Sequence, residues 1–186
     1  MNKMVIVAGP SAVGKSTLVA RIVEDLNVFE DTKTYTTRPM RENESPGDPY
    51  HHVTNEEFVK LKADGFFVEW AQVHTNYYGT PKHQIDDAWE KGKVIIMDVD
   101  VKGAKTFKGI YPEALTVFVH PPEFNELRRR LVSRDGAQAK DLDLRLKNAE
   151  DEISQADFFD VQLVNDDLEK SYAKFKKLVE DFIEHK

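Results

Sequence analysis

Residues 9–16 read GPSAVGKS and match the phosphate-loop pattern G-x-x-x-x-G-K-[ST] at every fixed position. This motif constrains the fold more than any other feature, because it requires a buried strand before it and a helix directly after it. Residues 4–8 form a short apolar run typical of a buried parallel strand, and residues 16–26 have the apolar spacing of an amphipathic helix. The sequence therefore predicts a strand, a glycine loop and a helix that together bind a polyphosphate.

The residues of the loop have separate tasks. Gly9 and Gly14 allow the backbone amides to face inward, and the helix N-terminus adds partial positive charge. Lys15 is expected to reach the outer phosphates, and Ser16 to offer its hydroxyl to Mg2+. Ala12 stands where glycine is common, and we expect the loop to tolerate its methyl group even if the backbone angles are unusual. The alternative is a glycine-rich turn without a ligand, in which Lys15 and Ser16 would have no structural role.

The composition limits the class of protein. A chain of 186 residues with 40% hydrophobic residues is long enough for one compact domain. Its net charge of −7 argues against a broad nucleic-acid surface, although basic residues cluster around Arg38 and over residues 128–134. The chain has no cysteine, which excludes disulfides and thiolate metal sites, and we recognise no signal peptide or membrane span. We expect a cytoplasmic monomer or homodimer that binds neither nucleic acid nor membrane.

Further apolar strands are predicted over residues 93–100, 115–119 and 161–164, with helical patterns between them. Buried strands alternating with amphipathic helices are typical of a three-layer α/β fold, in which ligands bind at the carboxyl ends of parallel strands. Residues 33–81 interrupt this alternation, and we interpret them as an inserted subdomain of short strands and one helix. That helix is expected to begin at Thr54, since Glu57 three residues later completes a capping box.

The second half of the chain is expected to be rich in helices. Pro121 and Pro122 precede a charged helical hairpin over residues 123–135 and 141–154, with a tip near Gly136. A last helix is predicted over residues 168–183, with one apolar face that should pack on the sheet. The residues of that face are Leu168, Tyr172, Phe175, Leu178, Val179 and Phe182.

Two carboxylates end the predicted strand at residues 93–100. Asp98 follows four apolar residues, the setting in which phosphate-loop enzymes keep a carboxylate near the magnesium and its water shell. Asp98 could instead cap the next helix. Asp100 would project to the same side as Asp98 if the strand continues that far, and it could then face a second substrate.

The inserted subdomain contains groups suited to a phosphate monoester. Arg38 and Arg41 are flanked by the hydroxyls of residues 34–37, and guanidinium groups bind phosphate in a bidentate manner. Tyr50 and Tyr78 could donate phenol hydrogens to the same phosphate. Taken alone, two such arginines are more often a solvated surface pair, and the residues around them favour the phosphate site.

Glu69 lies in an otherwise apolar and aromatic stretch, residues 66–71, where an unpaired carboxylate is costly to bury. It therefore needs a partner that donates hydrogen bonds. Guanine offers a ring N–H and an adjacent amino group, which match the two oxygens of one carboxylate. An adenine or sugar acceptor would leave Glu69 without these paired donors, which makes Glu69 the discriminating residue.

The segments GPSAVGKST, TYTTRPMR, GDPYHHV, EWAQVHTNYYGTPK, VIIMDVDVKGA and RRRLVSRD resemble, in order and at similar spacing, those of the guanylate kinase family. Many unrelated enzymes share the phosphate loop, whereas TTRP-x-R together with YGT and DVDVKGA is specific. The resemblance implies the fold of a phosphate-loop nucleoside monophosphate kinase and Mg2+-dependent transfer of the γ-phosphoryl group of ATP to GMP, giving ADP and GDP. It also implies a single domain with a core of residues 1–32, 82–121 and 157–186, a GMP-binding insertion at 33–81 and a lid at 122–156.

The resemblance also implies the site residues. The ATP site would comprise Gly9, Pro10, Ser11, Ala12, Val13, Gly14, Lys15, Ser16, Thr17 and Asn165. The GMP phosphate would meet Arg38, Arg41, Tyr50 and Tyr78, and guanine would meet Thr34, Glu69, Thr80 and Asp100. Gly79 would also belong to the GMP site. Catalysis would depend on Lys15, Arg38, Arg130, Arg134 and Arg145, and Mg2+ on Ser16 and on Asp98, the latter through water.

Some positions depart from the family pattern: Ala12 replaces a glycine, His52 a common phenylalanine and Thr75 a common glycine, and residues 135–137 lack a frequent threonine and glutamate. None of these changes removes a phosphate or guanine ligand. A guanylate-kinase-like module that only binds a phosphorylated protein segment is the alternative, against which the intact Lys15, Ser16 and Asp98 argue. We expect no essential catalytic histidine, and we expect the insertion and the lid to close over the bound nucleotides.

Overall fold

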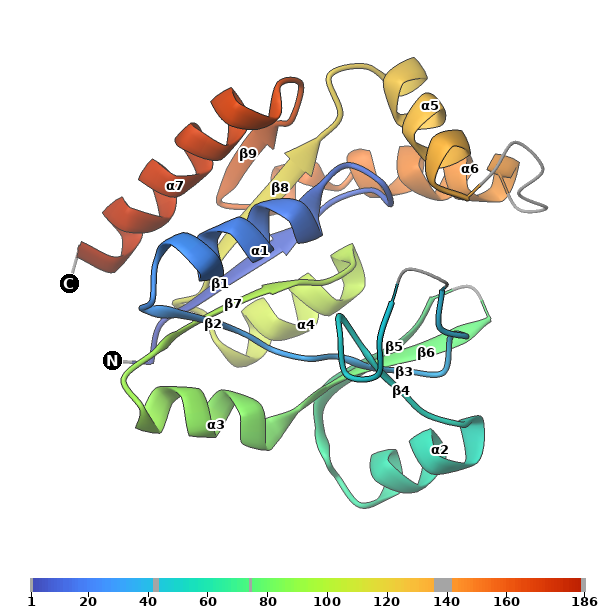
Figure 1. Cartoon of the computed structure of the whole chain (residues 1–186), viewed down its shortest axis with the longest axis vertical. Coiled ribbons are helices and arrows are strands. Elements are labelled where there is room, and N and C mark those ends of the chain that lie inside the picture. Colours follow the sequence, from blue (N-terminus) through green and yellow to red (C-terminus); the bar gives the residue numbers. More distant parts are fainter. Residues whose placement is uncertain (1, 42–43, 74, 136–141, 185–186) are drawn as a thin grey trace.

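The computed structural model describes residues 2–41, 44–73, 75–135 and 142–184. Its central sheet is parallel and has five strands in the order β2-β7-β1-β8-β9 (Figure 1). The strands are β1 (Met4–Ala8), β2 (Phe29–Asp31), β7 (Val94–Asp98), β8 (Leu115–His120) and β9 (Val161–Val164). This arrangement confirms the predicted α/β class.

Helices cover both faces of this sheet (Figure 1). One face packs against α1 (Lys15–Asp25) and α7 (Leu168–Glu184), and the other against α3 (Lys82–Glu90) and α4 (Val101–Ile110). Strand β1 lies at the centre and is fully buried, because its alternate side chains enter the two separate cores on the two faces. The three layers predicted from the alternation of strands and helices are therefore present.

Most predicted boundaries are met to within one residue, and two larger differences concern β2 and β7. Strand β2 was not predicted, because three residues are too few to show a period. Strand β7 ends at Asp98, two residues before the predicted end, because Asp100 caps helix α4 instead. The Asp100 carboxylate accepts a hydrogen bond of 2.6 Å from the Gly103 amide, which stabilises the first turn of α4.

A second, four-stranded sheet stands beside the first in the order β4-β3-β6-β5. It comprises β3 (Tyr35–Thr36), β4 (His51–His52), β5 (Phe67–Val73) and β6 (Asn76–Pro81), with helix α2 (Asn55–Ala63) packed on it. The capping box predicted at the start of α2 is confirmed, since the Glu57 amide donates to Thr54 Oγ1 and the Thr54 amide to Glu57 Oε2. Phe58 stacks on Phe67 and Tyr77, which fixes α2 to the sheet.

The predicted helical hairpin is formed by α5 (Phe124–Asp135) and α6 (Leu142–Ile153), and a short 3-10 helix, η1 (Ala156–Phe158), follows it. Its predicted tip at Gly136 lies outside the described residues. Leu127, Leu131 and Ala149 anchor the hairpin in the core beneath α1 and α7. Of the apolar face predicted for α7, Tyr172, Phe175 and Val179 are buried and Leu178 and Phe182 pack at the edge of the core. Leu168 is 40% exposed, so this part of the prediction is wrong. It is the first residue of α7 and lies outside the core.

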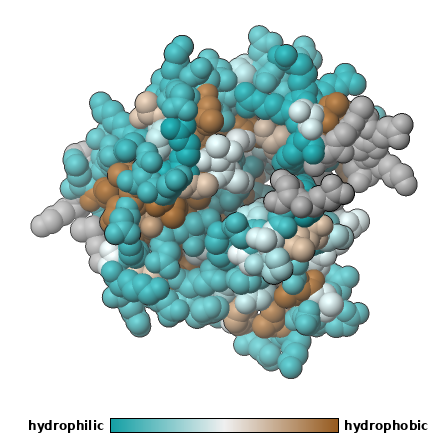
Figure 2. Space-filling view, in the orientation of Figure 1, coloured by the Kyte–Doolittle hydropathy of each residue, from teal (hydrophilic) through white to brown (hydrophobic). Residues whose placement is uncertain are grey.

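The surface is mostly hydrophilic on the face shown in Figure 2. Within the described part of the chain, every helix is too short or too polar to cross a lipid bilayer.

Candidate active site

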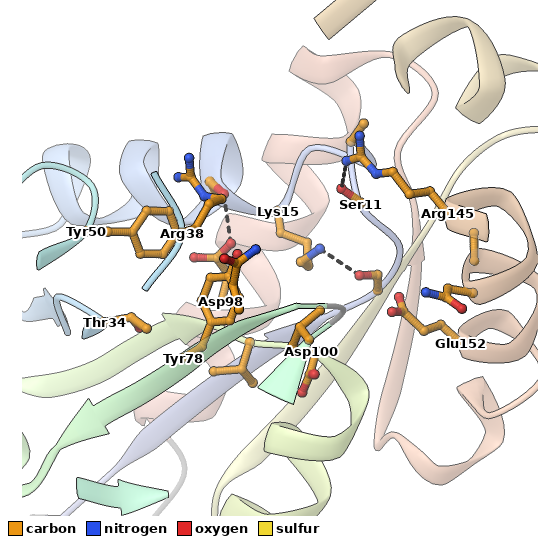
Figure 3. Close-up of a pocket in the computed structure, with 18 of the residues that line it drawn as sticks. Ser11, Lys15, Thr34, Arg38, Tyr50, Tyr78, Asp98, Asp100, Arg145 and Glu152 are labelled. Atoms are coloured by element: carbon orange, nitrogen blue, oxygen red, sulfur yellow. Dashed lines mark hydrogen bonds between the residues drawn. The ribbon is translucent and has the colours of Figure 1, made fainter. Parts of the chain in front are cut away.

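A cavity of about 940 Å³ opens at the carboxyl ends of β1 and β7. Three parts of the chain line it: the glycine loop after β1, the second sheet, and the α5–α6 hairpin. Figure 3 shows Arg38, Tyr50 and Tyr78 on one side of Lys15, with Arg145 and Glu152 on the other. The sheet thus brings residues more than a hundred positions apart in sequence into one site.

The glycine loop has the backbone that its motif predicts. Gly9 has φ 140° and Gly14 has φ 102°, values that favour glycine. A side chain on Gly9 would place its Cβ 2.4 Å from the Val119 carbonyl oxygen, so the position accepts no other residue without displacement of β8. Ala12 also lies in the left-handed region, with φ 66°, so the unusual backbone angles foreseen for this position are present.

Lys15 folds back on its own loop. Its ammonium group donates to the carbonyl oxygens of Gly9 at 2.6 Å and Pro10 at 3.0 Å. Burial lowers the pKa of Lys15, and the negative charges of Asp98 and Glu152 partly offset this effect. The ammonium group is thereby held at the loop, where the outer phosphates of a nucleotide would replace the carbonyl oxygens.

Ser16 and Asp98 form an oxygen-rich pair at the start of α1. The Ser16 hydroxyl donates to Asp98 Oδ2 at 2.7 Å. Asp31, at the end of β2, has its pKa raised to about 7 by burial and by the charge of Asp98. In the described residues, no three His, Cys, Asp or Glu side chains are grouped to hold a metal ion. A single carboxylate with a hydroxyl suits Mg2+, which takes its remaining ligands from substrate phosphates and water.

The predicted acceptor-phosphate residues come together at the second sheet. Arg38, Arg41, Tyr50 and Tyr78 all line the cavity. The Arg38 guanidinium lies 5.3 Å from the centre of the Tyr50 ring, and the rings of Tyr50 and Tyr78 meet edge to face. Burial raises the pKa of Tyr50, so its phenol keeps its proton and can donate to a phosphate.

A second part of the cavity contains buried polar groups that have no hydrogen-bond partner among the described residues. Glu69 is 8% exposed, and among the described residues its carboxylate makes no hydrogen bond. Burial, together with the charge of Asp100, raises the pKa of Glu69 to about 8. Thr80 is fully buried, and its hydroxyl also has no hydrogen-bond partner in the part of the chain that the structure describes. Burying polar groups without hydrogen bonds costs free energy unless a ligand supplies the missing partners. This part of the site is therefore suited to a ligand with several hydrogen-bonding groups.

The arginines of the hairpin converge on the glycine loop. Arg134 and Arg145 both donate to the Ser11 hydroxyl, at 2.9 and 2.8 Å. Arg130 donates to the carbonyl oxygens of Val13 and Asn165 and to Glu126. Guanidinium groups that gather around one neutral hydroxyl repel each other, so this part of the site is suited to an anion.

Four predicted binding residues do not line the cavity: Pro10, Val13, Gly79 and Asn165. Val13 is buried in the core, and Asn165 lies behind the loop, where its amide donates to the Val13 carbonyl at 2.8 Å. Gly79 lies against the Phe67 ring, which a Cβ would approach to 2.9 Å. These residues support the site from behind, and direct contact with a nucleotide stays a prediction for them.

Two acidic residues of the site were not predicted from the sequence. Glu152 lines the cavity from α6, and burial raises its pKa to about 7. Glu152 follows Arg145 by seven residues, a spacing that places both on one face of α6. This spacing could have identified Glu152 from the sequence. Glu44 contacts Arg38 and the backbone of Arg41, and its proximity to them in sequence was the available signal.

Known proteins similar to this chain include several guanylate kinases. A family model described as Guanylate kinase matches residues 1–182. A guanylate kinase from Bdellovibrio bacteriovorus is 49% identical over 182 residues, or 98% of each chain, and one from Nitratidesulfovibrio vulgaris is 38% identical over 93% of this chain and 84% of the relative. The crystal structure of guanylate kinase from Anaplasma phagocytophilum matches with a TM-score of 0.80 and 29% identity, over 96% of this chain and 85% of that one. A shikimate kinase from Bacteroides thetaiotaomicron, 18% identical with a TM-score of 0.51, shares the fold alone.

Proposed function

The chain belongs to the guanylate kinase family, and we propose that the residues around its cavity transfer the γ-phosphoryl group of ATP to GMP. ATP would lie on the glycine loop, with its phosphates among Lys15 and the hairpin arginines. GMP would lie on the second sheet, with its phosphate at Arg38 and Arg41. The two phosphates would then face each other across the cavity.

The observation that carries the assignment is that Glu69 and Thr80 lie opposite each other on β5 and β6, and within the described residues neither the Glu69 carboxylate nor the buried Thr80 hydroxyl makes a hydrogen bond. The ring N–H and amino group of guanine can donate to the two oxygens of Glu69, and Thr80 or Thr34 can donate to the guanine carbonyl. Asp100 lines the same part of the cavity and adds a further acceptor. Adenine offers no such pair of adjacent donors, so the site favours guanine.

The mechanism requires positioning and charge neutralisation rather than a strong base. Phosphoryl transfer passes through a loose transition state, in which the protein aligns the two nucleotides and stabilises charge on the moving group. Lys15, Arg130, Arg134 and Arg145 supply positive charge on the donor side, and Arg38 fixes the acceptor. The attacking oxygen of the GMP phosphate is already anionic near neutral pH.

Ser16 and Asp98 would hold Mg2+, Asp98 through water. Their oxygen atoms lie 2.7 Å apart at the end of the loop and fit this ion. When bound, Mg2+ neutralises charge on the donor phosphates. The protein's own part is to present these two oxygens next to Lys15.

The same proposal covers the organisation of the chain. Residues 33–81 would act as the GMP-binding insertion and residues 122–156 as a lid, around a core of residues 1–32, 82–121 and 157–186. Both excursions carry arginines that line the cavity, which supports closure around bound nucleotides. The substrates, ATP and GMP, support a cytoplasmic location, and either a monomer or a homodimer would present a complete cavity.

A coupled assay of ADP release tests this function, with GMP, AMP, CMP, UMP and IMP as acceptors. We expect fast turnover with GMP alone and much slower turnover with IMP, which lacks the amino group. Glu69→Gln should lower kcat/KM for GMP about a hundredfold or more, because its amide group no longer accepts both donors. KM for ATP should stay within about twofold, and Glu56→Gln, an exposed change on α2, should match the unmodified protein. Equal turnover of all acceptors, or full activity in Glu69→Gln, would contradict the proposal.

A further inference from the structure

His52 links two parts of the acceptor-phosphate site. It lies on β4, opposite Thr36 of β3, and its side chain is 16% exposed. Its Nδ1 is 2.8 Å from the Arg38 carbonyl oxygen, and its Nε2 is 3.4 Å from Glu44 Oε2. The imidazole ring therefore stands between the backbone of one phosphate-binding arginine and a carboxylate that contacts its side chain.

The chemistry of these neighbours determines which form of the ring fits. A carbonyl oxygen only accepts, so Nδ1 must carry a hydrogen. Nε2 is buried, has no hydrogen-bond partner in the part of the chain that the structure describes, and faces a carboxylate oxygen, which also only accepts. In a neutral ring, Nε2 would direct its lone pair at this negative oxygen. The doubly protonated ring is the form that can donate at both ends.

Glu44 connects the ring to both arginines. Its side chain is 6% exposed, and it accepts from Arg38 Nη2 at 2.7 Å and from the Arg41 amide at 2.9 Å. Burial opposes ionisation of Glu44, but these hydrogen bonds outweigh it and lower the pKa of Glu44. The Arg38 guanidinium also donates to the Pro39 carbonyl at 2.8 Å. The direction of the Arg38 side chain thus depends on where Glu44 is held.

We propose that His52 is a positioning residue for the acceptor phosphate: as an imidazolium, it donates to the Arg38 carbonyl and to Glu44 and so fixes the arginines that receive GMP. This inference rests on the proposed function. Among the described residues, Arg38, Glu44 and Tyr50 contact the ring, and Arg41 Nη1 lies 3.8 Å from the same Glu44 carboxylate. With His52 protonated, three cations and one carboxylate leave a net charge of two, which matches a phosphate dianion. With His52 neutral, only one positive charge remains.

The inference predicts a specific dependence on pH. Because the imidazolium form is the one that can donate at both ends, the advantage of the unmodified protein over His52→Phe in GMP binding should diminish toward alkaline pH, whereas the two proteins should bind ATP alike at every pH. Ionisation of the GMP phosphate near pH 6 affects every variant alike and cancels in the ratio between them. His52→Phe keeps an aromatic ring but removes both N–H donors. This variant should therefore lose the contribution of His52 to GMP binding at every pH.

The test compares KM for GMP, KM for ATP and kcat between pH 5.5 and 8.5. His52→Phe should raise KM for GMP about tenfold at the acidic end, leave KM for ATP within about twofold, and approach the unmodified protein at the alkaline end. His52→Gln, whose amide can donate toward Glu44, should recover part of the loss. His51→Phe is the matched control, because His51 packs on Tyr35 instead; it should leave KM for GMP unchanged. Equal KM values and pH profiles for His52→Phe and the unmodified protein would overturn the inference.

Two further outcomes separate possible failures. No GMP turnover in the unmodified protein would contradict the proposed function rather than the role of His52. If His52→Phe does not fold, nitrogen NMR of the imidazole groups in the unmodified protein bound to GMP decides the question. Both nitrogens of His52 should carry a proton in that complex, and a neutral ring would overturn the inference.

Discussion

The hydroxyl of Ser16 donates to Oδ2 of Asp98 across 2.7 Å and thereby joins the first turn of α1 to the end of β7. The two residues are 82 positions apart in sequence, and parallel pairing of β1 with β7 brings them together. Both oxygen atoms are ligands that Mg2+ prefers. The fold thus brings together the two side chains of the proposed magnesium site.

Asp98→Asn should therefore weaken the use of Mg2+. We expect kcat to fall about 10- to 100-fold and the Mg2+ concentration for half-maximal rate to rise, because an amide attracts the hydrated ion less than a carboxylate. A Mg2+ titration of the rate at saturating nucleotides measures both effects. Asp181→Asn, an exposed change on α7, is the control. An unchanged Mg2+ dependence in Asp98→Asn would show that this carboxylate is not near the metal.

Ala12→Gly should stabilise the protein. Ala12 has φ 66°, and a left-handed conformation costs a residue with a Cβ about 1–2 kcal/mol. The greater freedom of glycine in the unfolded chain offsets about 0.4–1 kcal/mol of this gain. We expect a net rise of roughly 0.5–1 kcal/mol in the free energy of unfolding, measured by urea denaturation. Ala173→Gly, at an exposed position inside α7, should instead lose about 1 kcal/mol. Destabilisation of both variants alike would contradict strain at Ala12.

The unliganded protein should lose stability as the pH rises from 5.5 to 8.5. The pKa of Glu69 is raised from 4.5 to about 8 in the folded state, so the folded protein holds a proton that the unfolded chain releases. Stability from this group is complete below pH 4.5 and is lost as the pH rises through 8. The shift corresponds to at most about 5 kcal/mol. Asp31 and Glu152, with pKa values raised to about 7, act in the same direction.

Urea denaturation of Glu69→Gln at several pH values checks this linkage. The neutral amide cannot titrate, so the stability of this variant should fall less steeply with pH than that of the unmodified protein. Glu56→Gln, on the exposed side of α2, should keep the original slope. Parallel slopes for all three proteins would rule out Glu69 as a source of the pH dependence.

Much of the fold could be predicted because its signals are local. The apolar runs of β1 and β9 and the capping box of α2 are each complete within a few residues, and the structure has them at the predicted positions. β2 could not be predicted in this way, because its three residues form a strand only by pairing with β7. The end of β7 was also predicted wrongly, because an aspartate can either extend a strand or cap a helix. Asp100 caps α4, since its carboxylate accepts a hydrogen bond from the Gly103 amide.

The site residues that belong to a sequence motif could be predicted, whereas those that act by contacting another site residue could not. The loop and the acceptor arginines have recognisable spacing, and the structure places them around one cavity. Glu44 and His52 carry no motif of their own. Their importance depends on the distances of 2.7 Å from Glu44 to Arg38 and 3.4 Å from Glu44 to His52, which only the folded chain defines.

Lys15→Met should abolish phosphoryl transfer while the fold persists. The methionine fills much of the same volume but brings no charge to the donor phosphates, so we expect kcat to fall at least about 10²- to 10³-fold. Because burial already lowers the pKa of Lys15, loss of its ammonium group should not destabilise the protein strongly. Circular dichroism and thermal unfolding check the fold, and the coupled assay checks turnover. Substantial turnover in Lys15→Met would refute the role given to the loop.

Ser11→Ala should loosen the hairpin from the glycine loop. The Ser11 hydroxyl accepts from both Arg134 and Arg145, so its removal takes a shared acceptor from two charged donors on different helices. Each hydrogen bond to a charged group contributes about 1.5–3 kcal/mol at most, and Arg134 is exposed, so we expect KM for ATP to rise only about three- to tenfold.

Small-angle scattering of the nucleotide-free protein separates this effect from a direct loss of phosphate contact. Ser11→Ala should give a larger radius of gyration without nucleotide and the original radius with an ATP analogue and GMP, because the phosphates then replace the hydroxyl as the common partner of the arginines. Ser133→Ala is the matched control, since Ser133 also lines the cavity, whereas the hydroxyl that both arginines share is that of Ser11. A raised KM with an unchanged radius would mean that Ser11 acts on the phosphates alone and does not hold the hairpin.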